Sequence, residues 1–155
     1  MHEPLTARQE IWRGLLLGQK AMLTDLAVEL KRDYGLTVPA YEALLSLWES
    51  PDNSLHATEL AKALVYSSGS ASNLIKRLAE AGLVTRSSGD EDGRTVRVSL
   101  TPTGVDVIER ATAAHRQSLA ETFEPLIDDD EVGPLLEFAR KLAAHTGVLS
   151  APVDE

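Results

Sequence analysis

The chain has 155 residues, of which 43% are hydrophobic and 25% charged, a balance typical of a folded protein with one core. It contains no cysteine, which excludes a disulfide framework, a thiolate metal site and a cysteine redox switch. The first residues lack the basic and apolar segments of a signal peptide, and no apolar run approaches the ~18 residues of a membrane span, so we expect a cytoplasmic protein.

The net charge of −9 is unevenly distributed along the chain. Residues 54–100 carry six of the 15 basic and five of the 24 acidic side chains, a net +1, which leaves −10 for the rest of the chain. Acidic flanks would direct a nucleic acid toward this central segment, although charge also fluctuates along ordinary proteins. Charge alone therefore leaves nucleic-acid binding open.

A first helix is predicted over about residues 5–33, with Gly35 as its stop signal. Its apolar residues recur at steps of three and four, the period of one helix face. They are Trp12, Leu15, Leu16, Leu23, Leu26, Ala27 and Leu30. At ~1.5 Å per residue the helix would be roughly 40 Å long, more than a small core needs, so we expect it to extend toward a partner.

Three shorter helices are predicted next, over about residues 38–49, 58–65 and 68–81. Ser67 or Ser68 is the expected N-cap of the third, because a serine hydroxyl can accept a hydrogen bond from a first-turn N–H. Gly82 ends that helix, since glycine readily adopts a positive φ.

Two strands follow, over residues 84–88 and 96–100, and the second alternates apolar and polar side chains. The polar segment between them has a glycine near each end, which predicts a β-hairpin. Thr101 and Pro102 then read as the N-cap and first residue of a long helix reaching Phe123 or beyond. Because Pro134 is awkward inside a helix, the last helix is expected to start near Gly133.

This order of elements, mainly α with a small β-hairpin, predicts a winged helix-turn-helix, in which the second helix enters the major groove of DNA. The exposed residues expected on that helix are Ser68, Ser70, Ser72, Asn73, Lys76 and Arg77, and the inward ones are Ala71, Leu74, Ile75 and Leu78. Asn73 could pair with adenine, and Lys76 or Arg77 could reach guanine or phosphate. The alternative is an ordinary solvated helix face.

The hairpin supplies further candidates for DNA contact. Arg94 at its tip could enter a minor groove, where negative potential is concentrated, with Asp92 orienting it through a charge-assisted hydrogen bond. Arg86, on the first strand, is a further candidate. The alternative is a plain turn with a solvated arginine.

Several short motifs together resemble the MarR family of transcriptional regulators. They are Gly82-Leu83-Val84-Thr85-Arg86, Asp92-Gly93-Arg94, the stretch 96–104 that ends Leu100-Thr101-Pro102-Thr103-Gly104, and upstream Glu59-Leu60-Ala61 and 78–83. The resemblance covers nearly the whole chain as a single domain, residues 1–155. It implies a winged helix-turn-helix over 38–101, flanked by dimerisation helices over 5–33 and 102–147.

The resemblance also implies function. It implies a homodimer on pseudo-palindromic duplex operators, with an aspartate–arginine pair in the wing, carried here by Asp92 and Arg94. Gly93 stands where many members have arginine or lysine, so one phosphate contact is expected to be missing. Members commonly release DNA when a small, often aromatic or anionic ligand binds between the dimerisation helices and the winged helix. Trp12 and Tyr41 are candidates to line such a pocket, although aromatic residues at helical spacing more often belong to a core.

No sequence feature predicts a cofactor, a metal site or an enzyme. The four histidines do not form the i, i+4 pairs of a helical metal site, and no phosphate loop, nucleophile elbow or paired catalytic carboxylate is found. The winged helix-turn-helix pattern predicts a DNA-binding regulator, and the resemblance to the MarR family implies a homodimeric repressor released by a small molecule. The alternative is a winged-helix protein-interaction module, or antagonist, that does not bind DNA.

Overall fold

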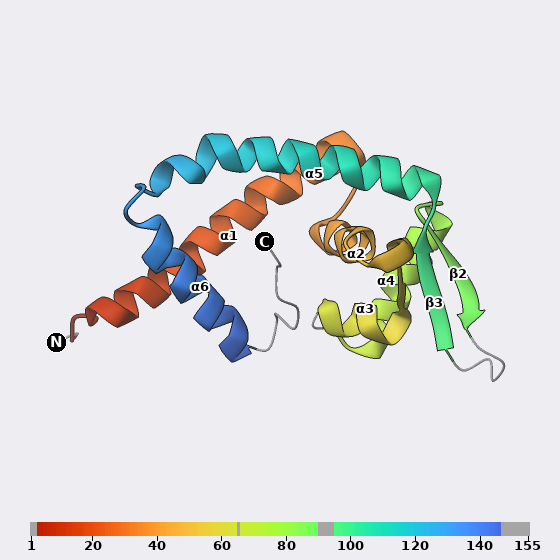
Figure 1. The fold of residues 1–155 in the computed structure, drawn as a ribbon, viewed down its shortest axis with the longest axis horizontal. Helices are drawn as coiled ribbons and strands as arrows, with labels where there is room; N and C mark the ends of the chain where they lie inside the picture. Colours follow the sequence, from red (N-terminus) through yellow and green to blue (C-terminus); the bar gives the residue numbers. More distant parts are fainter. Residues whose placement is uncertain (1–2, 65, 90–94, 147–155) are drawn as a thin grey trace.

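The computed structural model describes residues 3–64, 66–89 and 95–146. Helices dominate, joined by one small antiparallel sheet, as the sequence predicts (Figure 1). The helices are α1 (Ala7–Tyr34), α2 (Val38–Trp48), α3 (Ala57–Ala63), α4 (Ser68–Glu80), α5 (Pro102–Thr122) and α6 (Val132–Thr146). The strands are β1 (Ser54–His56), β2 (Val84–Gly89) and β3 (Thr95–Leu100), and short 3-10 turns span Pro51–Asn53 and Glu124–Leu126.

Capping residues place most helix ends where the sequence predicts them. Thr6 accepts a hydrogen bond from the Gln9 N–H, so α1 begins at Ala7 rather than at residue 5, and Gly35 ends it with φ 67°. Ser67, not Ser68, caps α4, and Thr101 caps α5 with Pro102 in its first turn. The caps follow ordinary backbone chemistry, which is why sequence alone locates them.

Two further helix starts differ from the prediction for local reasons. The helix α3 begins at Ala57, one residue early, because the Glu59 carboxylate accepts the His56 N–H at 2.8 Å and closes the first turn there. The helix α6 begins at Val132, with Pro134 in its first turn. Proline is tolerated there because first-turn N–H groups have no acceptor within the helix.

The sheet contains a strand that the sequence did not predict. Its order is β1-β3-β2, with β3 antiparallel to both neighbours, so Leu55 pairs with Val98 on one side and Arg86 with Val98 on the other. The strand β1 has only three residues, too few for a period-two pattern to show. It anchors the β2–β3 wing to the start of α3.

The core lies at one end of the molecule. Its largest fully buried side chains are Leu30, Leu44, Leu47, Leu60, Val98 and Ile108. They come from the end of α1, from α2, α3 and β3, and from the first half of α5. In Figure 1, α5 runs from the sheet across the molecule to the end that carries α6 and the start of α1.

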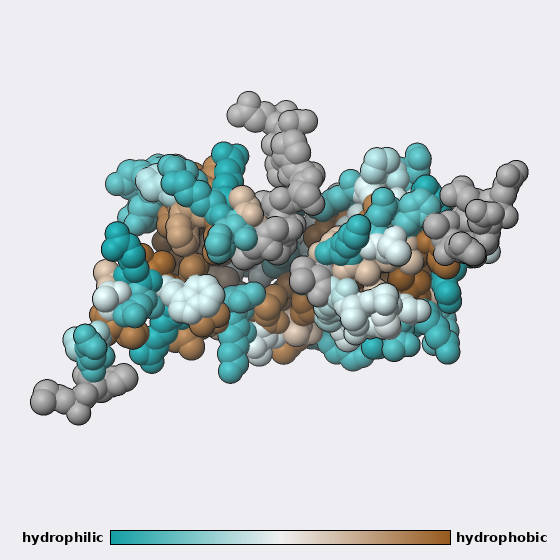
Figure 2. Space-filling model, turned by 90° about the horizontal axis from the view of Figure 1, so that it is seen from below, coloured by the Kyte–Doolittle hydropathy of each residue, from teal (hydrophilic) through white to brown (hydrophobic). Residues whose placement is uncertain are grey.

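The other end leaves apolar side chains uncovered. Every residue over 132–141 of α6 is exposed, and so are Ile11, Trp12, Leu15 and Leu16 on α1. Figure 2 shows hydrophobic surface among the polar side chains at this end. Among the described residues, no helix is both long and apolar enough to cross a lipid bilayer.

We expect Ile108→Ala to lower the free energy of unfolding by about 2–5 kcal/mol, and Ile108→Val by about 0.5–1.5 kcal/mol, because Ile108 is completely buried. Denaturant unfolding followed by circular dichroism, at one fixed protein concentration, measures both. Glu109→Ala, at the adjacent exposed position, is the control and should change stability little. Equal stability of the alanine variant and the wild type would show that α5 is not anchored in this core.

Candidate nucleic-acid interface

The helix α4 is supported on one side and open on the other. Its buried residues are Ala71, Leu74, Ile75 and Leu78. Its exposed residues include Ser68, Ser70, Ser72, Asn73, Lys76 and Arg77. Both sets agree with the sequence prediction. A helix with its apolar stripe buried and a polar face outward can be presented to a DNA groove without losing its own packing.

The first turn of α4 is shaped by two serines. The Ser67 Oγ accepts the Ser70 N–H at 3.3 Å, and the Ser67 hydroxyl donates to the Ser70 Oγ at 3.0 Å. Ser70 is a predicted DNA contact, and in the structure its hydroxyl also belongs to the cap. Short side chains at this end leave the backbone accessible to a large partner.

The basic residues of α4 differ in their surroundings. The Lys76 Nζ lies 3.8 Å from a Glu80 carboxylate oxygen, with both side chains more than 60% exposed. Such a pair contributes little to stability, so Lys76 can leave it for a phosphate. In the described part of the chain, no hydrogen bond or ion pair engages the side chains of Asn73 or Arg77. These two side chains lie four residues apart and share one helix face.

A small hollow lies beside α4, between α3 and the sheet. Its volume is about 110 Å³, and its polar residues are Thr58, Ser68, Ser72 and Arg86. Its other lining residues are apolar: Ala57, Ala61, Ala71, Ile75 and Val96. Three hydroxyl side chains and one guanidinium are groups that donate to phosphate oxygens. In the sequence, Thr58 marks only the predicted start of a helix. The feature that points to a further role is its position in the first turn of α3, beside the N-terminus of α4.

A polar cluster joins β3 of the wing to β1 and to the connection that follows α2. Arg97 Nη1 donates to the Ser54 Oγ at 3.0 Å, and the Ser99 hydroxyl donates to the same oxygen at 3.0 Å. The Ser54 N–H in turn donates to the Ser50 Oγ at 2.9 Å. In the sequence, Arg97 is only one of the six basic residues of 54–100, whereas in the structure its guanidinium joins β3 to β1. The predicted wing residues Asp92 and Arg94 lie outside the described residues.

The two proposed ligand-pocket residues are not brought together. Tyr41 is 4% exposed; its hydroxyl lies 3.5 Å from the Thr112 Oγ1 and its ring meets the His115 ring edge-on at 5.9 Å. Trp12 is 57% exposed near the start of α1. Eighteen residues of helix separate Trp12 from the buried Leu30, about 27 Å at ~1.5 Å per residue. Tyr41 is therefore a core residue, and Trp12 lies far from it.

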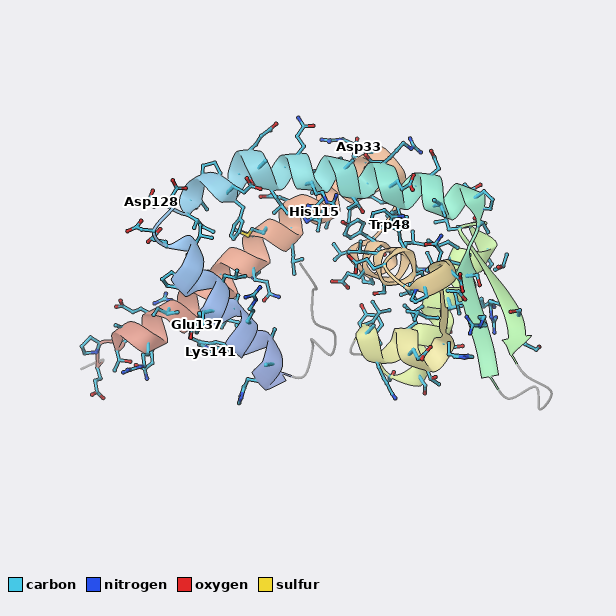
Figure 3. All side chains as sticks on the ribbon, viewed as in Figure 1. Asp33, Trp48, His115, Asp128, Glu137 and Lys141 are labelled. Atoms are coloured by element: carbon cyan, nitrogen blue, oxygen red, sulfur yellow. The ribbon has the colours of Figure 1, made fainter. Side chains whose placement is uncertain are left out.

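An apolar groove of about 480 Å³ does lie between α1 and α5, and His115 contributes to it. Its other lining residues are Gly14, Leu15, Gly18, Gln19, Met22, Leu23, Leu26, Leu119 and Phe123. Figure 3 shows His115 on the side of α5 that faces α1. Tyr41 borders this groove only through its contact with His115.

Comparison with known proteins places this geometry in a family. A sequence model described as the MarR family matches residues 34–95. The transcriptional regulator PapX of Escherichia coli is 30% identical over 138 residues, which cover 89% of this chain and 84% of PapX. This chain belongs to the MarR family. The organic hydroperoxide resistance regulator of Bacillus subtilis is 34% identical over 97 residues; the match covers 63% of this chain and 65% of that protein's length.

A solved structure extends the likeness to the whole fold. Sco3205, a MarR family regulator from Streptomyces coelicolor crystallised with DNA, superposes with a TM-score of 0.81 at 28% identity, over 92% of this chain and 90% of that one. The chain is thus a DNA-binding winged-helix transcriptional regulator of the MarR family.

Within this MarR-family fold, Asn73→Ala should weaken binding to the cognate operator by about 1–3 kcal/mol and relax the sequence preference at one base pair, if its amide pairs with a base.

Lys76→Ala should instead weaken binding to all duplexes alike and reduce the salt dependence of binding by about one unit of slope, as expected for one lost phosphate contact. Anisotropy titrations on the operator, on single-base variants of it and on random duplex, at several salt concentrations, distinguish the two. An equal loss for Asn73→Ala on every duplex would show that Asn73 only positions the helix.

Proposed function

We propose that this chain is a homodimeric repressor that binds an inverted-repeat operator and is released by a small ligand. The observation that carries the proposal is α4, whose buried apolar stripe leaves a polar face beside the wing. Two such helices related by a two-fold axis would enter successive major grooves about 10 base pairs apart. DNA occupied in this way at a promoter is closed to the transcription machinery.

The uncovered end of the molecule supports the dimer. Leu135, Leu136 and Phe138 of α6 are each 43–46% exposed, and the first half of α1 adds Ile11 and Trp12 at 56–57%. Apolar area of this extent at one end of a molecule is unfavourable in water and is usually buried against a partner. A second copy offers the same apolar faces in return, which is the arrangement of a two-fold interface.

The groove between α1 and α5 supports ligand control. It is lined mostly by apolar side chains, with the His115 imidazole among its few polar groups. An aromatic ligand fits such a lining, and an anionic substituent could accept a hydrogen bond from an imidazole N–H. We propose that Tyr41 acts through its contact with His115, and that Trp12, one turn before Leu15, covers the outer part of the groove in the dimer. Because α5 joins this groove to the winged helix, a ligand bound in the groove could change the distance between the two recognition helices of the dimer.

Leu136→Asp should convert the dimer to a monomer, because a carboxylate would be buried in the proposed interface. Sedimentation at micromolar concentration should give about twice 16.8 kDa for the wild type and 16.8 kDa for the variant, with the helical circular dichroism signal kept. Operator affinity should fall sharply in the variant. Arg140→Ala, an exposed change on the same helix, is the control. A monomeric wild type at this concentration would contradict the proposed dimer.

Small aromatic carboxylates such as benzoate should release the protein from its operator, and Leu119→Trp, which fills the groove, should abolish that response while leaving operator binding. Titration of the preformed complex with benzoate, and with cyclohexanol as an uncharged control, measures release. Release of wild type and Leu119→Trp alike would place the ligand elsewhere. Binding that is weak and equal on every duplex would instead favour an interaction module that does not read DNA.

A further inference from the structure

The start of α5 is hydrogen-bonded directly to the connection that follows the recognition helix α4. The Thr101 hydroxyl donates to the Gly82 carbonyl at 2.7 Å, and the Thr101 N–H donates to the Leu83 carbonyl at 3.0 Å. The same Thr101 oxygen accepts the Gly104 N–H at 3.0 Å, which caps α5. One threonine thus closes the first turn of α5 and ties that turn to residues 82–83.

Gly104 allows the two backbones to meet. A Cβ built at this position would lie 2.1 Å from the Leu83 carbonyl oxygen, 3.0 Å from its carbon and 3.3 Å from the Leu100 Cδ2. The obstacle is backbone, so no side-chain rotation can relieve it. Gly104 has an ordinary helical conformation, and what its position requires is the missing side chain rather than a positive φ. Any larger residue forces α5 and Leu83 apart by about 1 Å or more.

The connection at residues 82–83 is in turn part of the end of α4. The Leu83 N–H donates to the Leu78 carbonyl, and the Gly82 N–H to the Ala79 carbonyl, both at 3.0 Å. A continuous set of backbone hydrogen bonds therefore runs from the last turn of α4 through Leu83 to Thr101. From there α5 extends 21 residues toward the uncovered end of the molecule (Figure 1). This joint is a bonded route between the recognition helix α4 and the helix that leads to the proposed dimer interface.

We propose that Thr101 and Gly104 are positioning residues that fix α4 relative to α5, and so determine which spacing between two half-sites the dimer accepts. The inference rests on the proposed dimeric operator binding. A rigid joint is required because a small displacement at the start of α5 is enlarged along a helix of about 30 Å, at ~1.5 Å per residue. If the contacts of Thr101 and Gly104 merely stabilised the fold, their loss would lower the free energy of unfolding and leave the preferred half-site spacing unchanged.

Two variants and two controls test the proposal. Gly104→Ala inserts the obstructing methyl, and Thr101→Val removes the hydroxyl while keeping the branched shape. Thr101→Ser keeps the hydroxyl and should behave as wild type. Thr103→Ala, an exposed change in the same turn, should also behave as wild type. Each protein is titrated on the operator, on operators with one or two base pairs inserted or deleted between half-sites, and on one isolated half-site.

The expected result for Gly104→Ala and Thr101→Val is a loss of about tenfold or more on the native spacing, with half-site affinity kept and the preferred spacing shifted or broadened. Lowered thermal stability with an unchanged spacing preference would overturn the proposal. If Gly104→Ala does not fold, Thr101→Val decides by the same criteria. Failure of the wild type to bind the operator would refute the proposed function instead.

A second measurement does not depend on DNA. Because the chain has no cysteine, Lys62→Cys places one spin label on α3 of each subunit. Pulsed dipolar spectroscopy should show a shifted or broadened distance between the two labels when Gly104→Ala or Thr101→Val is added, and no change with Thr103→Ala. An identical distance distribution in all four proteins would contradict a positioning role. A single label without a partner would show that the dimer itself is absent.

Discussion

The molecule depends on the burial of one side of α4. Three buried side chains of that helix, Leu74, Ile75 and Leu78, belong to the same core as Leu44, Leu47, Leu60 and Ile108, so the neighbouring elements hold α4 in place. A helix whose outer face must contact DNA cannot be packed against the rest of the protein on that face. Its whole support must come from one face, which is why the apolar stripe is narrow and continuous and the opposite face is free to carry serine, asparagine and basic residues.

The buried core is unevenly distributed along the molecule. The winged helix and the first half of α5 are packed within one chain, whereas α6 and the first half of α1 expose apolar side chains that one chain does not cover. The helix α5 belongs to both regions. Under the proposed joint, a displacement at either end of α5 would be passed to the other end through the continuous helix, and the close contact at Gly104 would leave little room for movement at the α4 end.

Much of this could be predicted from the sequence. Helix periodicity and the caps Ser67 and Thr101 depend on neighbouring residues, so they are visible in one chain, and the two faces of α4 were assigned correctly. Periodicity does not tell whether an apolar face is covered by its own chain, which is why Tyr41, a core residue, was grouped with the exposed Trp12. The role of Gly104 was also hidden, because a glycine within a helix does not reveal the distant carbonyl against which it packs.

The ion pair between Lys76 and Glu80 has a consequence for how the protein finds its site. A genome offers a vast excess of unrelated sequence, and a regulator that holds tightly to any phosphate spends its time there. Glu80 competes with phosphate for Lys76 on every duplex alike, and a net charge of −9 weakens long-range attraction to DNA as a whole. We therefore expect residence on unrelated sequence to be short, so that occupancy of the operator depends on contacts that only the correct bases complete.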